Sequence, residues 1–190
     1  TSMEKLQSLP PAFVDPYGTV TAGNSSALTD GASATLLMAE EVADAEGFSP
    51  QAALRDYTYV AQDPGTELLL GPAYAIPQVL DGAGLSLDDI DVVELHEAFA
   101  GQVLAVLEAL QSDTFAEENL NRSSAVGTID PERLNAWGGS LSLGHPFGAT
   151  GTRLVTTAAH RLQVEDGQWA LVAACAAGGQ GHALLLERRP

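Results

Sequence analysis

Three short segments contain the side chains best suited to acid–base or thiol chemistry: "ELHEAF" around His96, "LGHPFGATG" around His145 and "ACAAGGQG" around Cys175. A cysteine becomes a strong nucleophile or proton acceptor when a nearby imidazole lowers its pKa. The glycines after Cys175 would let a substrate approach the backbone, whose N–H groups could then face a developing oxyanion. These segments therefore predict a site for acid–base and thiol chemistry.

Other chemistries fit the same segments less well. A zincin-type metal site would need histidine where Ala100 stands, and a phosphate loop would need a lysine that "GHPFGATG" lacks. One cysteine and scattered histidines also lack the spacing of a zinc finger, so we expect no metal. A structural role stays open for Cys175, because free cysteine is often a core residue. His160 and His182 are expected to be structural, one in a helix and one in a strand.

Alternating strand and helix patterns predict an α/β domain that positions these segments. A short β-prone stretch begins at Thr19, and longer β-prone apolar runs predict strands at 52–62, 91–95, 168–176 and 182–188. Apolar residues at helical spacing predict helices at 32–47, 72–84, 97–110 and 150–162. We expect a central mixed five-stranded sheet with helices on both faces and an antiparallel final pair. Sites in such sheets form where strands end and loops begin.

Composition argues against several partners. The net charge is −17 at pH 7 and Lys5 is the single lysine, so nucleic acid and anionic membrane surfaces would repel the chain. No apolar run reaches the ~18 residues of a membrane-spanning helix. The one cysteine, Cys175, cannot form an intramolecular disulfide. This is typical of a reducing compartment, and we expect a cytoplasmic location.

The motifs occur together in an order that is similar to the C-terminal half of the thiolases. "HEAF", "GHPFGATG" and "CAAGGQG" follow one another as in that family, and "TAGNSSALTDGASA" resembles the segment that enters this half. The resemblance extends roughly from Thr19 to Glu187. It implies a thiolase-like C-terminal domain over residues 19–190, and a lead segment over residues 1–18 that belongs to the preceding half of the protein.

The resemblance implies a role for each matching position. His145 would help to deprotonate a nucleophile and would bind the thioester oxygen, and His96 would complete that oxyanion hole. Cys175 matches the acid–base cysteine of the family, which exchanges a proton with the α-carbon of acetyl-CoA. The backbone N–H of Ala177 would serve a second oxyanion hole.

Two further positions are expected to contact the substrate. Ser26 matches a position beside the pantetheine arm of coenzyme A, and Gly144 belongs to the substrate-binding loop. The resemblance implies coenzyme A and acyl-CoA as substrates, with no permanently bound cofactor. The family's nucleophilic cysteine belongs to its N-terminal half and has no counterpart in this chain. That half is therefore an expected partner, and the chain alone is expected to be inactive.

Histidine at position 96, where most thiolases carry asparagine, resembles the β-subunits of fatty-acid oxidation complexes. This implies a 3-ketoacyl-CoA thiolase of β-oxidation, in a homodimer or in a larger assembly with a hydratase/dehydrogenase α-subunit. An imidazole at position 96 can also become charged near neutral pH, which an amide cannot. Two alternatives stay open. One is a non-catalytic thiolase-like subunit that binds acyl-CoA or lipid or acts as a scaffold, and the other is a biosynthetic thiolase that forms acetoacetyl-CoA.

Overall fold

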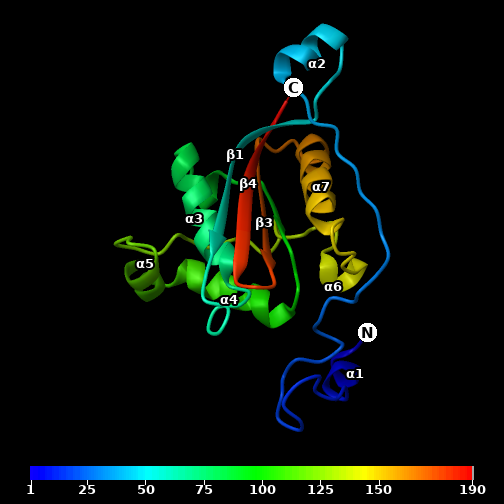
Figure 1. Cartoon of the computed structure of the whole chain (residues 1–190), viewed down its shortest axis with the longest axis vertical. Coiled ribbons are helices and arrows are strands. Elements are labelled where there is room, and N and C mark those ends of the chain that lie inside the picture. The colour runs from blue at the N-terminus through cyan, green and yellow to red at the C-terminus, as the bar shows by residue number, and fades with distance from the viewer. Residues whose placement is uncertain (190) are drawn as a thin grey trace.

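A four-stranded sheet forms the centre of this computed structural model, which describes residues 1–189 (Figure 1). The strands are β1 (Ala52–Ala61), β2 (Val92–Leu95), β3 (Trp169–Ala176) and β4 (Gln180–Arg188). Their order is β1-β4-β3-β2. β2 and β3 run parallel, whereas β4 is antiparallel to both of its neighbours. The predicted α/β class, the mixed sheet and the antiparallel final pair are confirmed.

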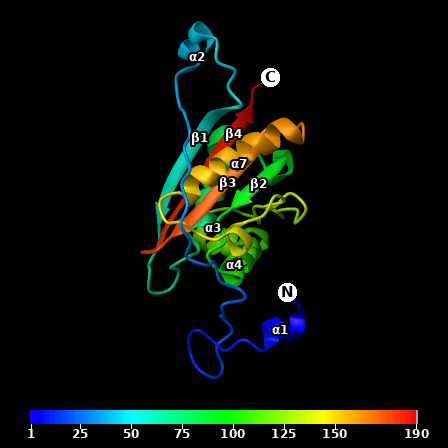
Figure 2. The ribbon, with the colours of Figure 1, turned by 90° about the vertical axis from the view of Figure 1, so that its right-hand side faces the viewer.

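Helices cover both faces of the sheet (Figures 1 and 2). The helices of these two layers are α3 (Gly71–Ala83), α4 (Ala100–Gln111) and α7 (Thr150–Val164). Alternate residues of a strand point to opposite faces. Leu171 and Ala173 therefore join the core with α3 and α4, whereas Val172 and Ala174 pack with α7. Burial on both faces explains why β2 and β3 are nearly continuous apolar runs in the sequence.

Several shorter helices lie outside these layers. They are α1 (Met3–Gln7), α2 (Glu40–Glu46), η1 (Leu87–Asp89), α5 (Asp113–Asn119) and α6 (Ser140–Leu143). The N-terminal segment passes along the outside of α6 and α7 and reaches α2 beyond the end of the sheet (Figures 1 and 2). Among residues 1–189, no helix is both long enough and apolar enough to cross a membrane.

The prediction of five strands is wrong for the residues that the structure describes. The β-prone stretch near residue 20 forms no strand, and the residues after it, Ser25 and Leu28, make only isolated bridges to the loops of the predicted site. Another strand would extend the sheet on the free side of β2. The segment that lies there makes a single parallel bridge, from Leu134 to Val93 of β2. Both segments pair one residue at a time, so neither gains the ladder of hydrogen bonds that defines a strand.

The helix expected over residues 32–47 is also shorter than predicted. Only α2, its second half, is helical, and residues 31–39 form neither a helix nor a strand. Leu36 and Leu37, which were to form its apolar face, are each 74% exposed. Ala39 offers no side-chain cap. Helical periodicity alone does not form a helix when its apolar face has no surface to pack against.

Candidate functional site

Two loops bring His96 and His145 into contact at the carboxyl end of β2. His96 directly follows this strand, and its N–H donates to the carbonyl of Ala173 on β3 at 2.9 Å. His145 lies in the loop before α7, and its N–H donates to the carbonyl of Ala27 at 2.8 Å. The centroids of the two rings are 4.2 Å apart and the rings are tilted by 40°. The structure thus places both imidazoles at one point, and the roles expected of them stay predictions.

Cys175 lies at the same end of the sheet. Leu95 pairs with Ala173 in the parallel register of β2 and β3, so Cys175 stands one residue beyond the position opposite His96. The thiol is buried, and this burial raises the pKa of Cys175 to about 11, whereas the sequence suggested a pKa lowered by an imidazole. The thiol is therefore protonated at neutral pH. It can give a proton, but it is not a thiolate ready to attack.

Ala177 follows Cys175 in the exposed turn between β3 and β4. The next two residues, Gly178 and Gly179, have φ angles of +94° and +75°. Only glycine adopts this left-handed region without strain, which explains the glycine pair after the cysteine. Ala177 is exposed in this turn, directly after the last residue of β3. Its role as an oxyanion donor stays a prediction.

Ser26 and Gly144, the two positions expected to contact the substrate, lie where an extended segment crosses these loops. The N–H of Ser26 donates to the carbonyl of Ala98 at 3.0 Å. Gly144 has a φ of +95°, and a Cβ at this position would come within 2.4 Å of Thr29. A glycine is thus required for the segment to pack directly on the histidine loop. Neither contact involves a ligand, so substrate binding at both residues stays a prediction.

Glu97 ties the two histidine loops together. Its carboxylate accepts hydrogen bonds from Nδ2 of Asn135 at 2.7 Å and from the N–H of Leu141 at 2.9 Å. A Cβ at Gly139 would stand 2.2 Å from this carboxylate, so only glycine leaves room for it. The glutamate of "HEAF" therefore positions the loop that leads to His145, and its charge is held by N–H donors.

Each imidazole has a hydroxyl partner. Nδ1 of His96 lies 2.9 Å from Oγ of Ser140, and Nδ1 of His145 lies 2.7 Å from Oγ1 of Thr150. Ser140 is 0% exposed and Thr150 is 4% exposed, so little water competes for either hydroxyl. These bonds fix the orientation of both rings, as second partners do for catalytic imidazoles in general.

Both imidazoles are neutral at neutral pH. Burial is the main cause that lowers the pKa of His96 to about 4, and electrostatic interactions with His145, Arg153 and His182 add to it. Burial and Arg153 also lower the pKa of His145. His96 could have become charged near neutral pH as an exposed imidazole, but it is only 3% exposed and its lowered pKa keeps it neutral there. His160, in contrast, is an exposed residue of α7.

Sequence reasoning missed the polar residues that hold this site together. They are Glu97, Asn135, Ser140, Thr150 and Arg153. All five lie inside or beside the motifs that carry the histidines, among glycines and apolar residues. A polar side chain among glycines and apolar residues could have indicated these contacts, because a buried polar group needs a hydrogen-bond partner.

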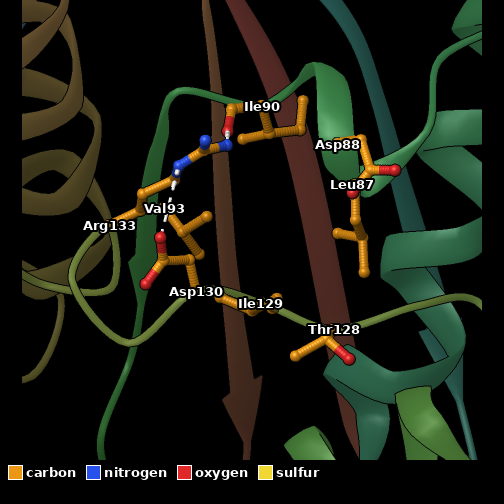
Figure 3. Close-up of a pocket in the computed structure, with 8 residues that line it drawn as sticks. All are labelled: Leu87, Asp88, Ile90, Val93, Thr128, Ile129, Asp130 and Arg133. Carbon is orange, nitrogen blue, oxygen red and sulfur yellow. Dashed lines mark hydrogen bonds and ion pairs between the residues drawn. The ribbon is translucent and has the colours of Figure 1, made fainter.

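A cavity of about 210 Å³ lies at the other end of β2 and contains none of the predicted site residues (Figure 3). It is lined by Leu87, Asp88, Ile90, Val93, Thr128, Ile129, Asp130 and Arg133. The guanidinium of Arg133 donates to the carbonyl of Ile90 at 2.7 Å and faces Asp130 at 3.8 Å (Figure 3). No three histidine, cysteine or acidic side chains within residues 1–189 gather so that they could hold a metal ion. The histidine pair thus stays the leading candidate site.

Two protein-family descriptions match the chain. "Thiolase, C-terminal domain" matches residues 48–188, and "Thiolase, N-terminal domain" matches residues 1–41. The two matched ranges meet between residues 41 and 48, and a boundary at residue 18 stays a prediction.

Similar proteins carry related names. The chain is 63% identical over 187 residues to "Probable 3-ketoacyl-CoA thiolase" of Caenorhabditis elegans. It is 62% identical over 190 residues to human "Trifunctional enzyme subunit beta, mitochondrial" and 48% identical over 187 residues to the 3-ketoacyl-CoA thiolase of Shewanella halifaxensis. These matches cover 98%, 100% and 98% of the chain but only 42%, 40% and 43% of the relatives. The chain thus spans about two-fifths of their length.

Solved structures share the fold over the whole chain. Human mitochondrial 3-ketoacyl-CoA thiolase in complex with CoA superposes with a TM-score of 0.83 at 37% identity. The dimeric peroxisomal thiolase of Saccharomyces cerevisiae superposes with a TM-score of 0.84 at 34% identity. Each match covers 100% of the chain and 43% of the solved protein.

Proposed function

Because this chain belongs to the thiolase family, we propose that it forms the C-terminal part of a 3-ketoacyl-CoA thiolase of fatty-acid β-oxidation. This activity converts a 3-ketoacyl-CoA and CoA into a shortened acyl-CoA and acetyl-CoA. The observation that carries the proposal is the contact between the neutral imidazoles of His96 and His145 at the sheet end where Cys175 lies. The names of the most similar relatives support it.

The histidine pair would stabilise the charge that develops during carbon–carbon cleavage. A cysteine of the N-terminal half would attack the 3-keto carbon, and His145 would help to remove its proton. The bond between C2 and C3 then breaks, and its electron pair moves into the thioester carbonyl of the departing acetyl-CoA. N–H donors of His96 and His145 would bind the resulting enolate oxygen. Removal of one such donor typically lowers the rate by ~10²–10³.

Cys175 would supply the proton that completes acetyl-CoA. Its pKa of about 11 means that the thiol carries a proton when the enolate forms. Transfer of this proton to C2 yields acetyl-CoA and leaves a buried thiolate. This thiolate is a stronger base than an ordinary thiolate of pKa ~8.5, so it can take the proton of the incoming CoA thiol. The CoA sulfur then attacks the acyl group and releases the nucleophilic cysteine.

The remaining expected contacts need the other half of the protein. The N–H of Ala177 would form the second oxyanion hole together with an amide beside the nucleophile. Ser26 and Gly144 would lie beside the pantetheine arm of CoA, and the CoA-bound human thiolase supports CoA as the substrate. We propose that residues 1–18 belong to the preceding half.

The assembly and the compartment are part of the same proposal. We propose a homodimer, supported by the dimeric yeast relative, or a larger assembly with a hydratase/dehydrogenase α-subunit. A cytoplasmic location rests on the lone Cys175, whereas the animal trifunctional relatives are named as mitochondrial. Fractionation of the source cells with an antibody to the protein would decide between these two compartments.

The test is a thiolysis assay on the complete protein, which contains both this chain and the N-terminal thiolase half. We expect CoA-dependent cleavage of 3-ketoacyl-CoA to acetyl-CoA, and at least a hundredfold slower reaction in His145→Ala. His160→Ala is the matched control, because this histidine is exposed on α7. Acyl-CoA binding without turnover would favour the non-catalytic alternative. Condensation of acetyl-CoA without cleavage of longer substrates would favour the biosynthetic one.

A further inference from the structure

Ser140 forms a buried link between His96 and a cation of α7. Its Oγ lies 2.9 Å from Nδ1 of His96 and 3.2 Å from Nη2 of Arg153. The other two nitrogens of this guanidinium, Nε and Nη1, are buried and have no partner within residues 1–189. The serine hydroxyl is therefore the group in this part of the chain that accepts a hydrogen bond from Arg153.

The proton count on Ser140 decides which nitrogen of His96 carries hydrogen. A guanidinium only donates, so Arg153 occupies one lone pair of the hydroxyl oxygen. The hydroxyl must then place its own proton on another acceptor, because Ser140 is 0% exposed and a buried unpaired donor is costly. Nδ1 of His96 is the acceptor within reach. With Nδ1 accepting, the proton of the neutral imidazole is on Nε2.

The hydroxyl of Thr150, which faces His145, does not determine the tautomer of this histidine. Oγ1 of Thr150 lies 2.7 Å from Nδ1 of His145, but it also lies 3.3 Å from the carbonyl of Pro146. Thr150 can therefore donate to this carbonyl and accept from His145, or donate to His145. The hydrogen bonds of Thr150 therefore do not fix which nitrogen of His145 carries the proton.

We propose that Ser140 and Arg153 are positioning residues that hold His96 as the Nε2–H tautomer, so that it presents only a hydrogen-bond donor to the thioester oxygen. This inference rests on the proposed function. It divides the work between two imidazoles that touch: His96 donates and does not take up a proton, while His145 transfers one. The charge of Arg153 also opposes protonation of both rings, in agreement with the lowered pKa of each.

The direct test is nuclear magnetic resonance of the complete, ligand-free protein labelled with ¹⁵N at histidine. We expect His96 to show a protonated Nε2 and an unprotonated Nδ1 between pH 5 and 8. In Ser140→Ala this preference is lost and both tautomers appear. Ser142→Ala is the matched control, because Ser142 is an exposed serine of the same helix and bonds only the carbonyl of Gly139 among residues 1–189. It should keep the wild-type pattern.

Turnover gives a second reading. Ser140→Ala should lower kcat by roughly 2- to 10-fold with little change in KM, the range that one neutral hydrogen bond corresponds to. Arg153→Gln offers Ser140 an alternative acceptor and should also mix the tautomers of His96. A proton on Nδ1 of His96 in the wild type would overturn the inference even if no variant folds. An Nε2–H signal in a protein without thiolysis would instead refute the proposed function and leave the tautomer assignment intact.

Discussion

Acidification should destabilise the protein through His96. The ring is buried after β2, which disfavours a positive imidazole, and Arg153 on α7 opposes the charge as well, as do His145 and His182 when they are protonated. In the unfolded chain the same imidazole binds a proton with its ordinary pKa of 6.5. As the pH falls, the unfolded state therefore gains a proton that the folded state does not accept, and the free energy of unfolding decreases.

The size of this effect follows from the two pKa values, 6.5 in the unfolded state and about 4 in the folded state. When folding lowers the pKa of a base, its contribution to stability is complete above about pH 6.5, the pKa of the unfolded state. This contribution is lost progressively as the pH falls to the pKa of the folded state. Between pH 7 and pH 5, His96 alone should remove about 2 kcal/mol from the free energy of unfolding. His145 and His182 also have lowered pKa values and act in the same direction.

Urea unfolding of the complete protein at pH 7 and pH 5 measures the effect. His96→Asn removes the titrating ring, so the variant should lose about 2 kcal/mol less than the wild type over this interval. His145 and His182 are present in both proteins, so only the part of their effect that depends on the charge of His96 remains in the difference. His160→Asn makes the same substitution at an exposed position of α7 and is the matched control. Equal pH dependence in wild type and His96→Asn would refute the conclusion that burial holds His96 neutral.

Three further predictions concern turnover and the core. Cys175→Ser should lower turnover by ~10²–10⁴ while an acyl-enzyme still accumulates in the mass spectrum; no acyl-enzyme would mean that Cys175 itself is the nucleophile. His96→Ala should lower the thiolysis rate by ~10²–10³ and His96→Asn by less, because an amide keeps a donor; full activity of the alanine variant would remove His96 from the site. Arg161→Met should cost about 3–5 kcal/mol in urea unfolding, because Glu94, 0% exposed and 2.8 Å from this guanidinium, loses its partner; a cost below ~1 kcal/mol would show that Glu94 does not need the pair.

The elements that carry the site could be predicted from the sequence because their signals are local. β3 is a continuous apolar run that ends at the Cys175 motif, and β2 is a short apolar run that ends immediately before His96. Two such buried strands that run parallel end at one edge of the sheet. Their order along the chain and the motifs after them were therefore enough to place both loops at the same end.

Features that depend on distant neighbours could not be predicted in this way. The apolar pattern of Leu36 and Leu37 predicted a helix, but no described segment covers these side chains. Burial lowers the pKa of His96 and raises the pKa of Cys175. Burial is a property of the folded chain and cannot be read from either motif. The link through Ser140 likewise joins residues 44 positions apart.

The absence of acidic residues from 135–155 follows from the charge that the proposed reaction develops. An enolate oxygen at the histidine pair is stabilised by N–H donors and by a nearby cation, and a free carboxylate would oppose it. Arg153 is the one charged residue in this stretch, and its guanidinium reaches the histidine pair through Ser140. Glu97, the carboxylate bonded to this loop, is occupied by two N–H donors. The loop thus combines a positive field with neutral imidazoles, which favours the enolate without protonating His96.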